Sequence, residues 1–314
     1  MLTIFNGFVI DLPSTGEGAL NATYVMYRYE VRASNGEALV GKDLLELIFS
    51  IAGDGAPYRV SDPTEADYRN FVIDPDVIFI AQKLCAIMDI GYLLDGRLKT
   101  EYDRTNNKLS VKWERSTDVR HSRAIFLLDD DIVAFRDGSG DRLTADSAVA
   151  RFRAILEFHT ECEFEYDRTA SSADIKKALN RLKVTEFSFD ARPFNPHPSK
   201  PGDILDKLLQ NANVGKLRGV AKSASDEGLS VSDDGLIDEV TGMADKNYAN
   251  FGMKGETKTG STVSYKKQRL TGDKQKDREH AEQARNLRVS VPSDDEETSE
   301  EEYVVMAIRE IFDV

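Results

Sequence analysis

The sequence predicts an α+β protein with two mixed sheet-and-helix subdomains, a charged flexible linker and a C-terminal helix. Strands are predicted where apolar and polar residues alternate, and helices where apolar residues recur at spacings of three and four. Both patterns run through the 314 residues, and they alternate in the second half of the chain. Such a mixture is typical of a layered α+β or α/β architecture and not of a helix bundle. Because 40% of the residues are apolar, the chain can bury a substantial core.

Residues 1–168 are expected to form an N-terminal α+β domain. Alternation predicts strands in TIFNGFVIDL, ATYVMYRYEVRA and NKLSVKWERS, and GKDLLELIFSIAG predicts an amphipathic helix. The segment FVIDPDVIFIAQKLCAIMDIGYLL begins as a strand, but periodicity leaves open whether a strand or a helix follows the turn at Asp74-Pro75. Two apolar arms flank the three aspartates at 129–131, which predicts a tight hairpin or a bulged edge strand.

A helix over residues 143–158, with Thr144 or Asp146 as its cap, and a short strand in CEFEYD complete this domain. A second α+β domain is expected over residues 169–269. There ASSADIKKALNRLK predicts a helix, and VTEFSFDA predicts the strand that follows it. DILDKLLQNAN and LIDEVTGMADKNY predict two further helices, and KLRGVAKSA and STVSYKKQR predict two further strands.

The apolar content falls after the second domain, so residues 270–299 predict a charged, mobile linker. Order is expected to return in a helix over residues 300–314. Its first residues are acidic, as the helix dipole favours. One face of this helix is apolar, and we expect it to dock on the body of the protein through Val304, Val305, Ile308 and Ile311.

The composition predicts a cytoplasmic protein that does not insert into a membrane. The longest apolar stretch is interrupted by Gln82, Lys83 and Asp89, which excludes it as a transmembrane span. The N-terminus lacks the basic region of a signal peptide. Cys85 and Cys162 stand outside any Cys/His ligand pattern, which favours buried reduced thiols over a disulfide or a zinc site.

Charge is segregated along the chain, whose net charge is −14. This acidity weakens any general attraction to phosphate, so nucleic-acid binding requires a local basic patch. Residues 246–288 contain eleven Lys and Arg against five Asp and Glu, whereas residues 294–302 contain seven acids and no base. Tyr248, Phe251 and Tyr265 lie among the lysines, and aromatic rings can stack on unpaired bases.

We therefore predict that the basic segment binds DNA through phosphate contacts, without reading its sequence. The candidate nucleic-acid-binding residues are Lys254, Lys258, Lys266, Lys267, Arg269, Lys274 and Lys276. The alternative interpretation is a solvated loop of mixed charge whose aromatic residues belong to the core. The acidic stretch that begins at Asp294 is near enough along the chain to compete for the basic groove, which would make it an intramolecular switch.

Several acidic groups allow a metal-dependent nuclease as an alternative, although we predict no catalytic residue, metal or cofactor. Residues 256–258, Glu-Thr-Lys, match the ExK element of such nucleases, with Asp238 or Asp245 as the second acid. That element requires a buried strand, whereas GMKGETKTGSTV is polar and rich in glycine. Three glutamates at alternate positions in 161–165 would share one strand face, which more often is an exposed face. The aspartates at 129–131 are more typical of a polar turn than of a cation site.

The order of several segments between residues 124 and 265 resembles RexA-type phage-exclusion proteins and related uncharacterised phage and bacterial proteins. These segments are AIFLLDDDIVAF with the helix after it, VTEFSFDARPFNP, ILDKLLQNAN and KLRGVAKSA. The resemblance implies a cytosolic homodimer that binds DNA as a sensor and acts with a separate membrane-protein partner, without an established enzymatic activity. It assigns no role to an individual residue. The chain departs from that family in its strong acidity and its long charged linker.

The residues and the resemblance together predict a non-enzymatic DNA-binding sensor or effector in phage exclusion or antiviral defence. Two alternatives stay open, a metal-dependent nuclease or toxin and a protein-interaction module that does not bind nucleic acid.

Overall fold

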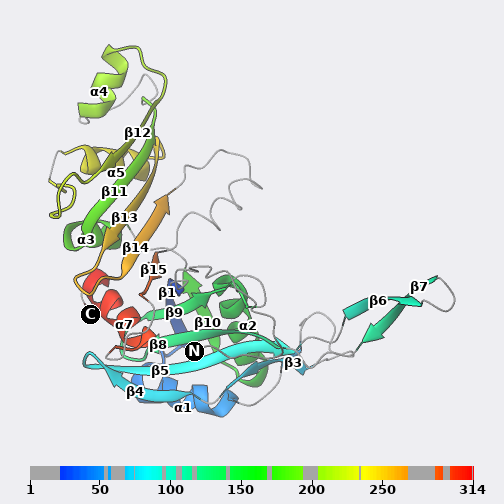
Figure 1. Cartoon of the computed structure of the whole chain (residues 1–314). Coiled ribbons are helices and arrows are strands. Elements are labelled where there is room, and N and C mark those ends of the chain that lie inside the picture. The colour runs from blue at the N-terminus through cyan, green and yellow to red at the C-terminus, as the bar shows by residue number, and fades with distance from the viewer. Residues whose placement is uncertain are drawn as a thin grey trace, which may run out of the picture.

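The computed structural model confirms the α+β fold, in which helices pack against one large antiparallel sheet (Figure 1). It describes residues 22–52, 56–57, 68–73, 75–93, 97–103, 108–114, 119–138, 142–167, 172–193, 204–232, 235–267, 287–292, 298–312 and 314. The first strand expected from the sequence, TIFNGFVIDL, lies outside these residues. Within them, no helix is long and apolar enough to cross a membrane.

The described helices are α1 (Gly41–Ile51), α2 (Ala145–His159), α3 (Ser172–Arg181), α4 (Ile204–Asn211), α5 (Leu236–Asp245) and α7 (Glu300–Phe312). The strands of the first half are β1 (Thr23–Arg32), β2 (Ala56–Pro57), β3 (Tyr68–Val72), β4 (Asp76–Ile80), β5 (Lys83–Leu93), β6 (Arg97–Asp103), β7 (Lys108–Glu114), β8 (Val119–Leu127), β9 (Ile132–Asp137) and β10 (Glu163–Asp167). Those of the second half are β11 (Lys183–Ala191), β12 (Leu217–Lys222), β13 (Ala249–Glu256), β14 (Thr262–Lys267) and β15 (Arg288–Ser290).

Thirteen strands form the main sheet, in the order β12-β11-β13-β14-β15-β1-β9-β8-β5-β3-β2, with β10 beside β1 and β4 beside β5. Strands β6 and β7 form a separate hairpin. The main sheet joins the two predicted domains through β15, which pairs with β1 of the first domain and with β14 of the second. The domain boundaries stay a prediction, but the two units share this sheet.

Local patterns explain most of the elements. The segment left open by periodicity folds as the β4–β5 hairpin, because Ala81 and Gln82 form a two-residue turn with φ of 48° and 69°. The aspartates at 129–131 lie in the turn between β8 and β9, as expected for a tight hairpin. The hydroxyl of Thr144 accepts a hydrogen bond from the Ser147 N–H at 3.3 Å and so caps α2.

Two segments differ from the expectation. Residues 249–256 are not a polar connection but β13, in the interior of the sheet, where Ala249, Phe251 and Met253 alternate inward. The glycines between them concealed that alternation. Strand β15 lies inside the predicted linker, because Leu287, Val289 and Val291 are buried there. Isolated apolar residues in a charged segment can thus still form a strand.

The main sheet has two faces, which we call the α7 face and the α2 face. Tyr24 and Met26 of β1 belong to the core on the α7 face, together with residues from α3, α4, α5 and α7. Val25 and Tyr27 belong to the core on the α2 face, with residues from α1 and α2. That second core contains no residue of strands β11 to β15. Within the described chain, the α2 face of these five strands therefore has no helical cover, and we call it the open face.

Helix α7 lies where the two halves of the sheet meet, beside α3 (Figure 1). As the sequence predicts, Val304, Val305, Ile308 and Ile311 are buried. Burial of each such side chain stabilises the fold by about 1.5–3 kcal/mol. The terminal helix is therefore part of the core.

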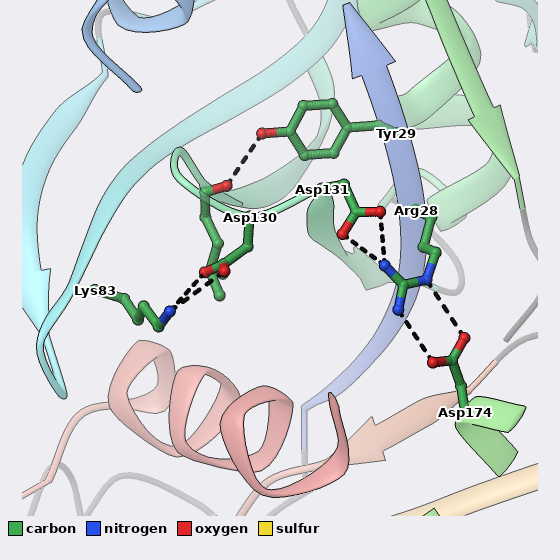
Figure 2. A network of polar contacts seen from close by, with 7 residues as sticks. Arg28, Tyr29, Lys83, Asp130, Asp131 and Asp174 are labelled. Atoms are coloured by element: carbon green, nitrogen blue, oxygen red, sulfur yellow. Dashed lines mark hydrogen bonds and ion pairs between the residues drawn. The ribbon is translucent and has the colours of Figure 1, made fainter. Parts of the chain in front are cut away.

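Polar contacts around Arg28 reinforce this junction (Figure 2). The Arg28 guanidinium donates to Asp131 of the β8–β9 turn and, at 3.1 Å, to Asp174 of α3. It also lies over the ring of Phe312 of α7, 5.2 Å from the ring centroid. One side chain of β1 thus contacts the turn, α3 and the terminal helix. In the same region, Lys83 pairs with Asp130 at 3.1 Å.

Candidate nucleic-acid interface

The open face carries a row of charged side chains across five neighbouring strands. In the register of the sheet, the residues that follow one another from β12 through β11, β13 and β14 to β15 are Lys222, Glu186, Lys254, Ser264 and Arg288. Three of the five are basic. Neighbouring strands lie about 4.8 Å apart, so the row extends for roughly 20 Å.

A hollow of about 400 Å³ lies over the middle of this row. Small residues on three adjacent strands, Ser188, Gly252 and Ser264, contribute to its lining. Lys254 and Lys266 also line it. A second hollow of about 520 Å³ shares Ser188, Gly252 and Lys266 with the first and extends toward β12. Short side chains beneath long cationic ones therefore leave a continuous depression on the open face.

The basic residues of the open face differ in their partners. Lys222 pairs with Glu186 at 3.5 Å, and Arg288 donates to Asp137 at 2.9 Å. Lys254 and Lys266 are exposed, and neither forms an ion pair with another residue of the described ranges. These two ammonium groups can therefore bind an anion without the loss of an ion pair to any described residue.

Part of the positive charge on the β12 side of the open face is offset by the carboxylate of Asp190. Burial would raise the pKa of Asp190, but hydrogen bonds from Lys216 and Arg218, together with their charges, hold it below its usual value. Arg218 donates to this carboxylate at 3.0 Å and Lys216 lies 2.8 Å from it. Asp190 thus stays ionised and offsets the charge of Arg218.

The structure brings together only part of the predicted set of lysines. Lys254 and Lys266 share the open face and the hollow. Lys258 lies in the turn after β13, where its backbone N–H donates to the Glu310 carboxylate of α7 at 3.0 Å. Lys267 pairs with Asp245 of α5 on the α7 face, so it does not join the open face. Arg269, Lys274 and Lys276 lie outside the described residues.

The predicted set lacks several basic residues of the open face, among them Arg218, Lys222 and Arg288. In LRGVAK, alternation alone places Arg218 and Lys222 on one strand face. Their proximity to Lys254 depends on the strand order β12-β11-β13, which no local pattern encodes.

The aromatic residues of the basic segment belong to the core, as the alternative interpretation has it. Phe251 and Tyr265 are buried on the α7 face, with ring centroids 5.5 Å apart. Tyr248 is half-buried and packs against the same core. Because these rings face the helices, stacking of bases on them from the open face is excluded.

Three residues of the acidic stretch, Glu300, Glu301 and Glu302, form hydrogen bonds at the start of α7. Glu300 accepts a hydrogen bond from the Tyr24 hydroxyl and lies 3.3 Å from Arg136. Glu301 accepts from Arg123, and Glu302 caps the helix by accepting from the Ser299 N–H at 3.0 Å. These three acids do not contact the open face, whereas residues 294–297 lie outside the described ranges.

The acids proposed for a nuclease do not converge. Glu256 pairs with Lys183 at 3.3 Å, whereas Asp245 lies on the opposite face of the sheet. Asp238 pairs with Lys176 at 3.5 Å. Of the three glutamates in 161–165, only the last two lie within β10, where both are exposed. Across the described part of the chain, no group of three His, Cys, Asp or Glu residues is placed to hold a metal ion.

The fold and site define a helix-flanked antiparallel sheet with one uncovered, partly basic face. A family model described as Domain of unknown function (DUF4747) matches residues 96–287, so the chain belongs to that family. The matched region contains all the open-face residues named above except Arg288. No curated protein and no solved structure matches the chain. The resemblance to RexA-type proteins stays a prediction.

Proposed function

We propose that this protein binds nucleic acid, with DNA as the first candidate, through phosphate contacts on the open face of its sheet. The observation that carries the proposal is the pair Lys254 and Lys266. These exposed lysines project from neighbouring strands beside one hollow and have no ion-pair partner among the described residues. Each bound phosphate releases condensed counterions, which supplies most of the affinity in binding of this kind.

The number of contacts sets the expected salt dependence. If only Lys254 and Lys266 bind phosphate, the slope of log K against log salt is about −1.8. If Lys222, Arg218 and Arg288 also exchange their carboxylate partners for phosphates, five contacts give a slope of roughly −4.5. The net charge of −14 opposes binding at long range, so the affinity is expected to be modest at physiological salt.

Binding is expected to be independent of sequence. Among the described residues, the open-face lining of both hollows offers hydroxyl, amide and cationic side chains together with the carboxylates of Glu186 and Asp190, while Phe251 and Tyr265 belong to the opposite core. Cations and hydroxyl groups contact the backbone, and backbone contacts carry no direct sequence information.

The wider role belongs to the same proposal. A DNA-binding protein of this kind would act in the cytoplasm as a non-enzymatic sensor or effector in phage exclusion, as a homodimer with a membrane-protein partner. The support for that role is the resemblance in segment order. The open face supports only the nucleic-acid part.

A binding assay with charge-reversed variants tests the proposal. The full chain would be titrated onto labelled single- and double-stranded DNA of one sequence, as wild type and as Lys254→Glu/Lys266→Glu. A matched control, Lys177→Glu/Lys207→Glu, makes the same charge change at exposed positions of α3 and α4. We expect the open-face variant to lose at least about tenfold in affinity and the control to lose far less. Equal losses in both variants, or no binding by the wild type at low salt, would refute the proposal.

A further inference from the structure

The outer edge of β4 is a strand edge whose hydrogen-bonding groups are not used by any described strand. Strand β4 pairs with β5 on one side, and no other strand of the described chain pairs with its second side. Edges of this kind can add a strand from another chain. The hydrogen-bonding direction of β4 can be derived from its hairpin.

The two-residue turn fixes that direction. Ile80 and Lys83 flank the turn, and the residues that flank a two-residue turn form a hydrogen-bonded pair. Hydrogen-bonded and non-bonded pairs alternate along an antiparallel ladder, so Ile78 is the next residue bonded to β5. The N–H and C=O groups of Val77 and Phe79 therefore point away from β5, toward the free edge.

The side chains at this edge are apolar and exposed. Val77 is 38% exposed, Ile78 41% and Phe79 75%. From residue 77 to residue 80 the strand contains no charge. Exposed apolar side chains on an unpaired strand form a surface that favours association.

The other free edges of the described sheet carry features that oppose pairing. Strand β2 has two residues and ends in Pro57. Strand β10 has three acids in five residues, and β12 carries Arg218 and Lys222. Charges, proline and short length are the usual protections of a sheet edge. Strand β4 begins with Asp76, but its exposed residues 77–79 carry no charge and no proline, which favours pairing of this edge with another strand.

We propose that β4 pairs with β4 of a second copy of this chain, antiparallel and about a two-fold axis at Ile78. In that register Val77 lies opposite Phe79 of the other copy, and each of these two residues presents the N–H and C=O that the other requires. Ile78 lies opposite itself. The three exposed apolar side chains, Val77, Ile78 and Phe79, therefore meet apolar side chains, while Asp76 at the end of the strand lies opposite Ile80. The contact is closed because it uses the same surface twice.

Oligomer measurements on the full chain test this surface. Sedimentation equilibrium of the wild type should show a dimer, whose population rises with salt because salt screens the repulsion between two chains of net charge −14. Val77→Lys/Phe79→Lys places like charges in the shared edge, so the dimer dissociation constant should rise at least about tenfold. Leu208→Lys, at a 56% exposed position of α4, should leave it unchanged. A monomeric wild type, or a dimer that the double substitution leaves intact, would overturn the proposal.

Disulfide cross-linking tests the register and does not depend on the stability of the variants. Across a two-fold axis at Ile78, the two Cα atoms of this non-bonded pair would lie about 4.5 Å apart, which is within the range of a disulfide. Ile78→Cys should therefore give a covalent dimer on oxidation. Ile73→Cys, at a 52% exposed position of the same segment, should not. Both changes belong in a Cys85→Ala background, because Cys85 is the register partner of Ile78 within one chain. Cross-linking that is no greater for Ile78→Cys than for Ile73→Cys would exclude this register. A disulfide from Ile78→Cys to a different protein, in place of the second copy, would overturn the proposal.

Discussion

Arg28 donates hydrogen bonds to both carboxylate oxygens of Asp174, at 3.1 and 3.4 Å, and so joins β1 to α3. The same guanidinium donates to Asp131 and lies over Phe312 (Figure 2). Burial would lower the pKa of Arg28, but hydrogen bonds from the guanidinium to the two carboxylates raise it, so the group stays charged. A charged group with three partners from three elements fixes the junction at which α7 docks.

Replacement of Arg28 by Ala should destabilise the fold. Two carboxylates lose a common donor and Phe312 loses a packing partner, which we expect to cost about 2 kcal/mol because the guanidinium is partly solvated. Arg32→Ala is the matched control, since Arg32 and its partner Glu30 are both more than 40% exposed. That control should cost much less, because the exposed pair is screened by solvent. Urea unfolding measures both values, and equal costs would show that the junction does not depend on Arg28.

Tyr24 and Tyr29 should make the stability fall at high pH. Burial raises the pKa of both phenols, and for Tyr24 the hydrogen bond to Glu300 raises it further. A pKa that is raised in the folded state gives stability that is complete below the unfolded value, near 10, and is lost as the pH rises above it. The unfolding free energy should fall more slowly above pH 10 in Tyr24→Phe than in the wild type, by about 1.4 kcal/mol per pH unit. Tyr29→Phe should show the same effect. If the unfolding free energy of both variants falls with pH as steeply as that of the wild type, the two phenols do not cause the loss of stability.

Some features of the fold can be predicted from the sequence. Val304 and Ile308 predict a docked terminal helix, and the aspartates at 129–131 predict a hairpin turn, because both depend on short-range periodicity. Lys266 and Lys267 are adjacent in a strand, so only one of them can reach a given face. The alternation in STVSYKKQR already implies that separation, although both lysines stood in the predicted site.

Long-range pairing explains what the sequence could not predict. Lys222 and Lys254 are thirty-two positions apart and become members of one row because β11 lies between their strands. Strand β4 has no second described strand beside it, because it pairs only with β5 at the side of the main sheet. Local periodicity identifies strands and their faces, but it does not state which strands become neighbours.

A side chain placed in the hollow should reduce binding without unfolding the protein. A Cβ at Gly252 would lie 3.0 Å from the Ser188 hydroxyl oxygen, which can rotate away. In Gly252→Val the new side chain would stand between Lys254 and Lys266, so we expect it to lower the DNA affinity several-fold. The unfolding free energy should change by less than about 1 kcal/mol. Gly215→Val, at a position with open space around it, should leave binding unchanged. Unchanged binding by Gly252→Val would show that the hollow is not occupied by DNA.

We expect DNA to stay intact in the presence of the protein. Glu256 pairs with Lys183, and Asp245 lies on the opposite face, so these two acids cannot hold a catalytic metal together. Plasmid incubated with the protein in magnesium or manganese should therefore remain supercoiled, for the wild type and for Glu256→Gln alike. Cleavage by the wild type that Glu256→Gln abolishes would support the nuclease alternative instead.

The most direct measurement is the salt dependence of DNA binding when Lys254 and Lys266 are neutralised. The slope of log K against log salt would be compared between the wild type, Lys254→Gln/Lys266→Gln and the control Lys177→Gln/Lys207→Gln. Loss of two phosphate contacts should make the slope less steep by about 1.8, and the control should keep the slope of the wild type. Identical slopes for all three proteins would show that phosphate does not bind at Lys254 and Lys266, and would contradict the central claim.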